Sequence, residues 1–104
     1  MPKVKISVIK MLNTNELFGK NPPVHAAEVS YAPVCPKLKE GQEFLADFTC
    51  PHGFCGVAFM DMQKEIEHVM LGGSYPWIKE KGVALSCCSD GMRPVIFKLE
   101  RVEG

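Results

Sequence analysis

Residues 82–102 read GVALSCC, then SDGMRP, then VIFKLERV, and this stretch decides the fold. Two apolar runs flank a cluster of turn residues, which is the sequence pattern of a β-hairpin. The turn contains Asp90 and Gly91, a pair that is suited to positive φ angles. In the last run every second residue from Val95 to Leu99 is apolar. One face of this strand is therefore predicted to lie in the core.

The first run of the hairpin ends in two adjacent cysteines, Cys87 and Cys88. A regular strand places neighbours on opposite faces, so both thiols reach one metal ion only if a bulge re-aims one of them. A disulfide between neighbours would close a strained ring. We expect Cys87 in the core, on the same face as Val83 and Leu85, and Cys88 on the other face.

The totals restrict the class of protein. A chain of 104 residues is the size of one domain, and it can bury a core that is stable without disulfide bonds or a structural metal. Twelve basic and twelve acidic side chains balance, which leaves no electrostatic footprint for nucleic acid or an anionic membrane. No apolar run approaches the ~20 residues of a membrane span, and the first residues read as a strand rather than a signal peptide. Residues 1–104 are predicted to form a single cytoplasmic domain with neither nucleic acid nor a membrane as partner.

Two more strands are predicted upstream of the hairpin. Residues 3–11 alternate, with Val4, Ile6 and Val8 on one face, and residues 42–48 alternate in the same way. Between these strands, residues 13–36 are rich in asparagine, glycine and proline. For that segment we expect a covering loop with one helical turn around residues 16–18 and a second short helix around residues 24–29. The histidine in it, His25, is expected to be an ordinary surface residue.

Residues 55–71 carry the pattern of an amphipathic helix. Its apolar stripe consists of Phe59, Met62, Ile66, Val69 and Met70. The two glycines at 72–73 are suited to end it.

The predicted order is β-loop-β-α-β-β, which gives an α+β domain with a small, mainly antiparallel sheet of about four strands and one amphipathic helix. A small, partly closed β-barrel with one helix is the alternative. A sheet covered by one helix leaves an apolar or edge surface open. We therefore expect a homodimer or larger homo-oligomer at micromolar concentration.

Several short segments carry a resemblance: residues 35–36 (CP), 39–44 (KEGQEF), 53–55 (GFC), 72–73 (GG), 76–77 (PW), 79–80 (KE) and 87–101 (CCSDGMRPVIFKLER). Together they resemble a family of small, uncharacterised prokaryotic proteins of about one domain. The resemblance implies a shared fold and shared thiols at Cys35, Cys55, Cys87 and Cys88, and it implies no activity. The chain departs from the pattern in residues 13–33, in the additional Cys50, and at residues 56–57, where relatives carry a tryptophan-containing stretch.

Four cysteines are candidate metal ligands: Cys35, Cys50, Cys55 and Cys87. Cys50 and Cys55 are separated by four residues, which is within the range seen in zinc sites, and His52 lies between them. Four soft ligands on loops and strand ends could hold zinc or an iron–sulfur centre. The more frequent alternative is that these cysteines are small buried hydrophobic residues.

Cys55 is also a candidate reactive thiol. It stands where the helix is predicted to begin, and the positive end of a helix stabilises a thiolate. A neighbouring cysteine could resolve an oxidised form, which would make the chain a thiol-based redox protein. The alternative is a residue buried at the start of the helix.

A small-ligand site is the third candidate, formed by Asp90, Arg93 and Trp77. Arginine suits a carboxylate or phosphate, although a structural Asp90–Arg93 pair that fixes the turn is the more frequent arrangement. Trp77 is either an exposed binding platform or, more commonly, a residue that closes the edge of a core.

The functional prediction is a binding module. The sequence contains no Walker loop, dinucleotide-binding glycine pattern, nucleophile elbow or carboxylate dyad, which disfavours an enzyme. The predicted site of the module is the cysteine cluster, with a metal or a small molecule as its ligand. A thiol-based redox protein and a homo-oligomeric interaction protein are the alternatives.

Overall fold

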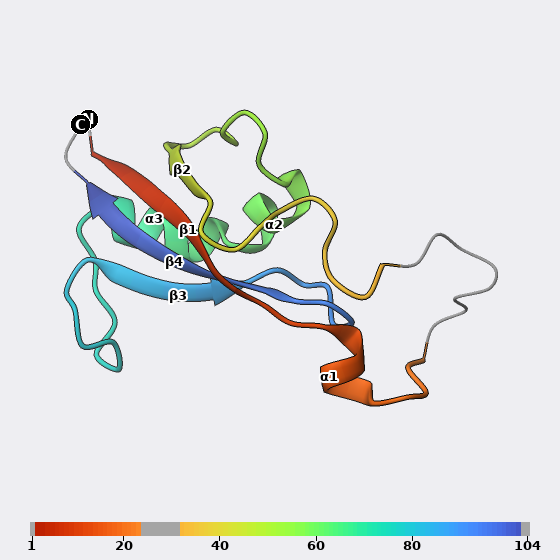
Figure 1. The fold of residues 1–104 in the computed structure, drawn as a ribbon. Coiled ribbons are helices and arrows are strands. Elements are labelled where there is room, and N and C mark those ends of the chain that lie inside the picture. The colour runs from red at the N-terminus through yellow and green to blue at the C-terminus, as the bar shows by residue number, and fades with distance from the viewer. Residues whose placement is uncertain (1, 24–31, 103–104) are drawn as a thin grey trace.

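Four antiparallel strands form one open sheet in the order β2-β1-β4-β3, as Figure 1 shows. The computed structural model describes residues 2–23 and 32–102. The strands are β1 (Lys3–Met11), β2 (Glu43–Ala46), β3 (Val83–Cys87) and β4 (Val95–Val102). This sheet and the helices below confirm the predicted α+β class, and because the sheet is open the alternative of a partly closed barrel is wrong.

The two long strands, β1 and β4, lie at the centre of the sheet, and each contributes three buried hydrophobic residues to the core. The predicted alternation of β1 is confirmed, because Val4, Ile6 and Val8 are all buried. In β4 the residues Phe97 and Leu99 pair with Val8 and Ile6 of β1, so their side chains share the same face of the sheet. The opposite face carries Lys5 of β1 and Lys98 and Glu100 of β4, whereas Arg101 pairs with Val4 and shares its face.

One face of the sheet is covered by α2 (Gly56–Asp61) and α3 (Gln63–Met70), which lie on the same side of it in Figure 1. All five residues of the predicted apolar stripe are buried. The single helix predicted over 55–71 is instead two helices, because the backbone at Met62 leaves the helical region at φ −102° and ψ 8°. The predicted end of the helix is confirmed: Gly72 has φ 95°, and Gly72 N and Gly73 N donate to the carbonyls of Val69 and His68.

A third helix, α1 (Thr14–Phe18), is the helical turn predicted in the long segment after β1. Asn13 and Glu16 form a capping box at its start. Thr14 is fully buried, and its hydroxyl donates to the Met92 carbonyl at 2.8 Å. This hydrogen bond ties the segment to the turn of the β3–β4 hairpin. The short helix predicted around 24–29 and His25 lie outside the described residues.

The strand predicted over 42–48 is shorter than expected. It ends at Ala46, since Asp47 accepts hydrogen bonds from the backbone and hydroxyl of Thr49 and so turns the chain. Phe48, predicted to face the core, is therefore 52% exposed.

The face assignment of β3 is wrong by one residue. The pairs Ala84–Leu99 and Ser86–Phe97 place the even-numbered residues on the helix-covered face. Cys87 is consequently exposed, and Cys88, the next residue, packs against the core. The sequence suggested the wrong face because the odd-numbered residues Val83, Leu85 and Cys87 form an apolar series. Of these three residues only Val83 is buried.

The turn of the hairpin also differs from the prediction. Neither Asp90 nor Gly91 has a positive φ. The Asp90 carboxylate instead accepts hydrogen bonds from the backbones of Met92 and Arg93, at 3.0 and 3.3 Å, which closes the turn with ordinary backbone angles. Among the residues that the structure describes, no helix is long and apolar enough to cross a membrane.

Candidate functional site

The four predicted cysteine ligands do not form a metal centre in the described part of the chain. Cys50 is exposed on the loop after β2, and Cys87 is exposed at the end of β3. Cys35 and Cys55 are half-buried and pack against the core. Within residues 2–23 and 32–102 there is no group of three or more His, Cys, Asp or Glu side chains that could hold a metal ion. The zinc or iron–sulfur site thus lacks an assembled set of ligands among these residues.

Three of the thiols occupy different local environments. Cys55 is the N-cap residue of α2, which confirms its predicted place at a helix start, but α2 has only six residues. Partial burial raises the pKa of Cys87, and the nearby Cys88 and Asp61 raise it further. The sulfur of Cys88 accepts a hydrogen bond from the Val95 backbone at 3.3 Å. The Cys87 thiol is therefore less acidic than an ordinary cysteine, and Cys88 has a structural role in the hairpin.

Asp90 and Arg93 form the structural pair that the sequence favoured. Arg93 Nε donates to Asp90 Oδ2 at 3.0 Å, and Arg93 Nη1 donates to the carbonyl of Ala32 at 3.0 Å. Partial burial alone would raise the pKa of Asp90, but hydrogen bonds from Met92 and Arg93 and the charge of Arg93 outweigh it, so this pKa lies below its ordinary value. The guanidinium is thus engaged in joining the hairpin turn to the preceding loop.

Trp77 belongs to a different site, because the pocket that it lines includes neither Asp90 nor Arg93. Its side chain is 74% exposed, so the prediction that it closes the edge of the core is wrong. Its ring packs against that of Tyr75, with centroids 5.0 Å apart, and Tyr75 packs against His68 at 4.6 Å. The tryptophan is exposed because this stack holds it on the loop 71–82 rather than over the core.

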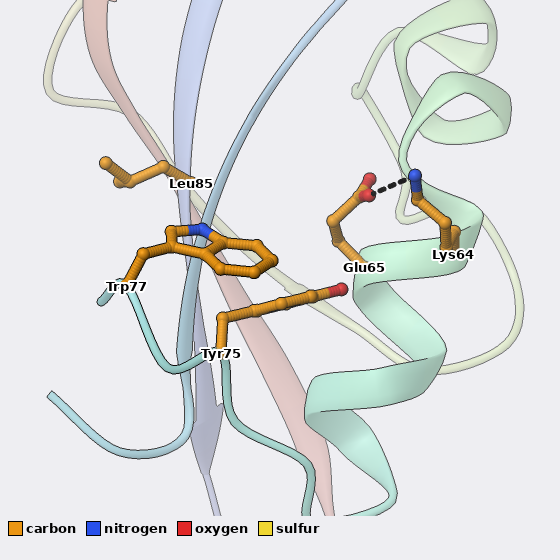
Figure 2. Close-up of a pocket in the computed structure, with 5 residues that line it drawn as sticks. All are labelled: Lys64, Glu65, Tyr75, Trp77 and Leu85. Atoms are coloured by element: carbon orange, nitrogen blue, oxygen red, sulfur yellow. Dashed lines mark ion pairs between the residues drawn. The ribbon is translucent and has the colours of Figure 1, made fainter. Parts of the chain in front are cut away.

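A pocket of about 210 Å³ opens beside these aromatic rings. We call it the aromatic pocket; its lining residues are Lys64, Glu65, Tyr75, Trp77 and Leu85. They come from α3, from the loop 71–82 and from the edge strand β3. Figure 2 shows the indole of Trp77 lying between Leu85 and Tyr75, with the hydroxyl of Tyr75 directed toward Glu65.

Glu65 supplies the negative charge of the aromatic pocket. Its side chain is only 15% exposed, and its two oxygens are engaged by different groups. Ser86 of β3 donates to Oε1 at 3.1 Å, and the ammonium of Lys64 lies 3.3 Å from Oε2. Burial raises the pKa of the Tyr75 hydroxyl, and the charge of Glu65 raises it further. Tyr75 is therefore neutral over the physiological range, and Glu65 and Lys64 are the charged groups of the pocket.

Local contacts hold the loop 71–82 in place over α3. His68 Nε2 lies 3.2 Å from the carbonyl oxygen of Ser74, and the Ser74 hydroxyl accepts a hydrogen bond from Gly82 N at 2.9 Å. A Cβ at Gly73 would overlap the His68 ring, so a glycine there lets the histidine pack against Tyr75. The orientation of both aromatic rings follows from these contacts.

Sequence reasoning found one of the five lining residues, Trp77. It missed Glu65 and Lys64, which lie on the polar side of the predicted helix, as well as Tyr75 and Leu85. The spacing of Tyr75 and Trp77, two positions apart in one loop, was a usable signal, because each combines an apolar ring with a polar group and such residues are enriched at binding surfaces. In comparisons with family models, with curated proteins and with solved structures, no match was found.

Proposed function

We propose that this chain is a non-catalytic binding module and that its aromatic pocket holds an organic cation. The observation that carries the proposal is the exposed Trp77, stacked on the half-buried Tyr75, beside the partly buried carboxylate of Glu65. Tryptophan and tyrosine faces attract ammonium and guanidinium groups, by about 0.5–2 kcal/mol depending on how far the cation is desolvated. A carboxylate next to them adds a charge-assisted hydrogen bond.

The size of the pocket restricts the ligand. Pockets for drug-sized molecules enclose roughly 300–1,000 Å³. About 210 Å³ is room for a single side chain or a small amine rather than a nucleotide or a cofactor. The lining is aromatic and aliphatic apart from Glu65 and Lys64, so the ligand presents an apolar stem and a charged end.

Without a ligand, the ammonium of Lys64 forms an ion pair with the carboxylate of Glu65. The side chain of Lys64 is 84% exposed, so this ammonium is weakly held and easily displaced. An incoming cation takes its place on Glu65 Oε2. It follows that removal of Lys64 strengthens the binding of a cation, whereas removal of the Glu65 charge weakens it.

The test uses butylguanidinium as the cationic probe and butylurea as its neutral counterpart. Trp77 is the one tryptophan of the chain, so tryptophan fluorescence reports on the pocket directly. We expect butylguanidinium to change this fluorescence saturably and butylurea to have little effect. Glu65→Gln should weaken binding at least fivefold, which corresponds to about 1 kcal/mol, and Lys64→Ala should strengthen it by up to about fivefold.

The matched control is Glu67→Gln. It removes the same charge two positions along α3 from a residue that does not line the pocket. This variant should bind butylguanidinium like the unaltered chain. Equal binding of butylurea and butylguanidinium, or equal losses for Glu65→Gln and Glu67→Gln, would contradict a cation site in the pocket.

A homodimer is a second proposal, supported by an exposed apolar pair on α2. Val57 and Met60 are three positions apart, lie on one side of the helix and are both exposed. We expect sedimentation at micromolar concentration to give twice the chain mass of 11.5 kDa, and Met60→Lys to restore the monomer. The mass of a single chain throughout that range would contradict the dimer.

A further inference from the structure

The open edge of the sheet lies next to the aromatic pocket. In the order β2-β1-β4-β3 the strand β3 has β4 as its neighbour on one side, and no other strand among the described residues pairs with it. Leu85 belongs to β3 and also lines the pocket, and Ser86 bonds the pocket carboxylate of Glu65. A chain that docks along β3 would therefore pass the pocket.

The register shows which backbone groups of β3 face outward. Arg101 N donates to the Gly82 carbonyl and Cys88 N donates to the Val95 carbonyl, so Gly82 and Cys88 direct their backbone groups toward β4. In an antiparallel pair this direction alternates from residue to residue. The backbone N–H and C=O groups of Val83, Leu85 and Cys87 consequently point away from β4, along the open edge.

The residues of β3 themselves carry no protection against pairing with another strand. Natural edge strands are blunted by charged residues, prolines, bulges or short length. The five residues of β3 include no charge and no proline, and their pairing with β4 is regular. The opposite edge is different. Its strand β2 has only four residues and begins with a charged residue, Glu43, which forms an ion pair with Lys5 of β1. The unprotected edge is thus the one beside the pocket.

We propose that β3 accepts an extended peptide as a fifth strand and that a basic side chain of this peptide enters the aromatic pocket. The proposal rests on the cation site described above and names its source: a lysine or arginine in a protein segment rather than a free amine. The backbone hydrogen bonds along β3 provide the affinity for the peptide, and the pocket provides the specificity for a basic side chain. Side chains alternate along a strand, so the basic residue directed toward Glu65 has apolar neighbours that lie beside Leu85.

A second copy of this chain fits the edge less well. Its own β3 has the sequence VALSC, which contains no basic residue to place against Glu65. In a β3–β3 pair, the carboxylate of Glu65 would therefore still have Lys64 as its cationic partner and would gain none from the second copy. Charge complementarity favours a basic peptide as the occupant.

The experiment uses an acetylated and amidated peptide of about seven residues, long enough to span β3, with a central arginine between valines and with serines outside them. Two N-methylated versions form the matched pair. One is methylated at alternate residues whose N–H groups would face β3, and the other at the intervening residues. Binding is followed by Trp77 fluorescence and by hydrogen exchange of the Val83, Leu85 and Cys87 amides.

We expect the unmethylated peptide to bind at least tenfold more tightly than butylguanidinium and to protect the outward-facing amides of β3 from exchange. Methylation in one register should lower affinity at least tenfold, since two or more hydrogen bonds of roughly 0.5–1.5 kcal/mol each are lost, and methylation in the other should have little effect. Cys87→Pro removes an outward donor at an exposed residue that does not line the pocket, so it should abolish the advantage of the peptide while β3 still pairs with β4. Retained butylguanidinium binding would show that this variant is folded.

The outcomes separate the two proposals. Pairing along β3 is overturned if the peptide binds no more tightly than butylguanidinium, or if both methylated peptides bind with equal affinity. In either case the proposed cation site in the pocket is retained. If neither probe binds, the proposed function is overturned as well. A dimer that Cys87→Pro dissociates would show that a second copy occupies the edge, which also overturns the peptide proposal.

Discussion

Replacing Phe97 with alanine is expected to lower the free energy of unfolding by about 3–5 kcal/mol. Phe97 is fully buried in the central strand β4 and pairs with Val8 of β1 and Ser86 of β3. Its ring meets that of Phe54 edge to face, with centroids 5.5 Å apart. Truncation removes this contact and opens a cavity between the sheet and the helices, which the rigid β-sheet cannot close.

The loss is measured by urea unfolding followed by far-ultraviolet circular dichroism. Trp77 is already exposed in the folded state, so tryptophan fluorescence is a poor reporter of unfolding here. The matched control is Phe48→Ala, the same truncation at a half-exposed side chain, which should cost about 1 kcal/mol or less. If Phe97→Ala does not fold, Phe97→Leu provides a milder change of about 1.5 kcal/mol or less. Equal losses at positions 97 and 48 would contradict the described core.

Ile66→Ala should destabilise the chain by about 2–5 kcal/mol. Ile66 is fully buried on α3 and belongs to the core cluster that the helix shares with β1 and β4. Alanine favours helix more than isoleucine does, so local propensity opposes the loss slightly and the cost reflects packing. Ile66→Val removes one methylene and should cost about 0.5–1.5 kcal/mol.

Its control is the neighbouring residue, Glu67, whose side chain is exposed on the same helix. Glu67→Ala should change stability by about 0.5 kcal/mol or less. A near-zero effect of Ile66→Ala in the same urea measurement would mean that the stripe does not pack on the sheet. A loss of unfolding free energy that is larger for Ile66→Ala than for Ile66→Val would show that the cost grows with the side-chain volume removed.

The elements with an unambiguous period could be predicted from the sequence. The strand over residues 3–11 and the stripe from Phe59 to Met70 are correct because each has one polar and one apolar side. The β3–β4 hairpin was recognisable from its turn cluster. Its phase was not, because Val83, Leu85 and Cys87 form an apolar series although only Val83 is buried. Pairing with β4, which fixes the face, is a tertiary interaction.

The candidate site was decided by tertiary structure. The aromatic pocket joins Glu65 of α3, Trp77 of the loop and Leu85 of β3, and no spacing in the sequence indicates that these three residues meet. The cysteines show the converse: sequence neighbours and suggestive spacings did not produce a ligand set among the described residues. The sequence by itself determined the strand over residues 3–11 and the apolar stripe from Phe59 to Met70, since both follow from local periodicity. Only the packing of α3 against the sheet and the order of the strands decided which polar and aromatic side chains meet and which edge stays open, because these depend on contacts between residues far apart in the chain.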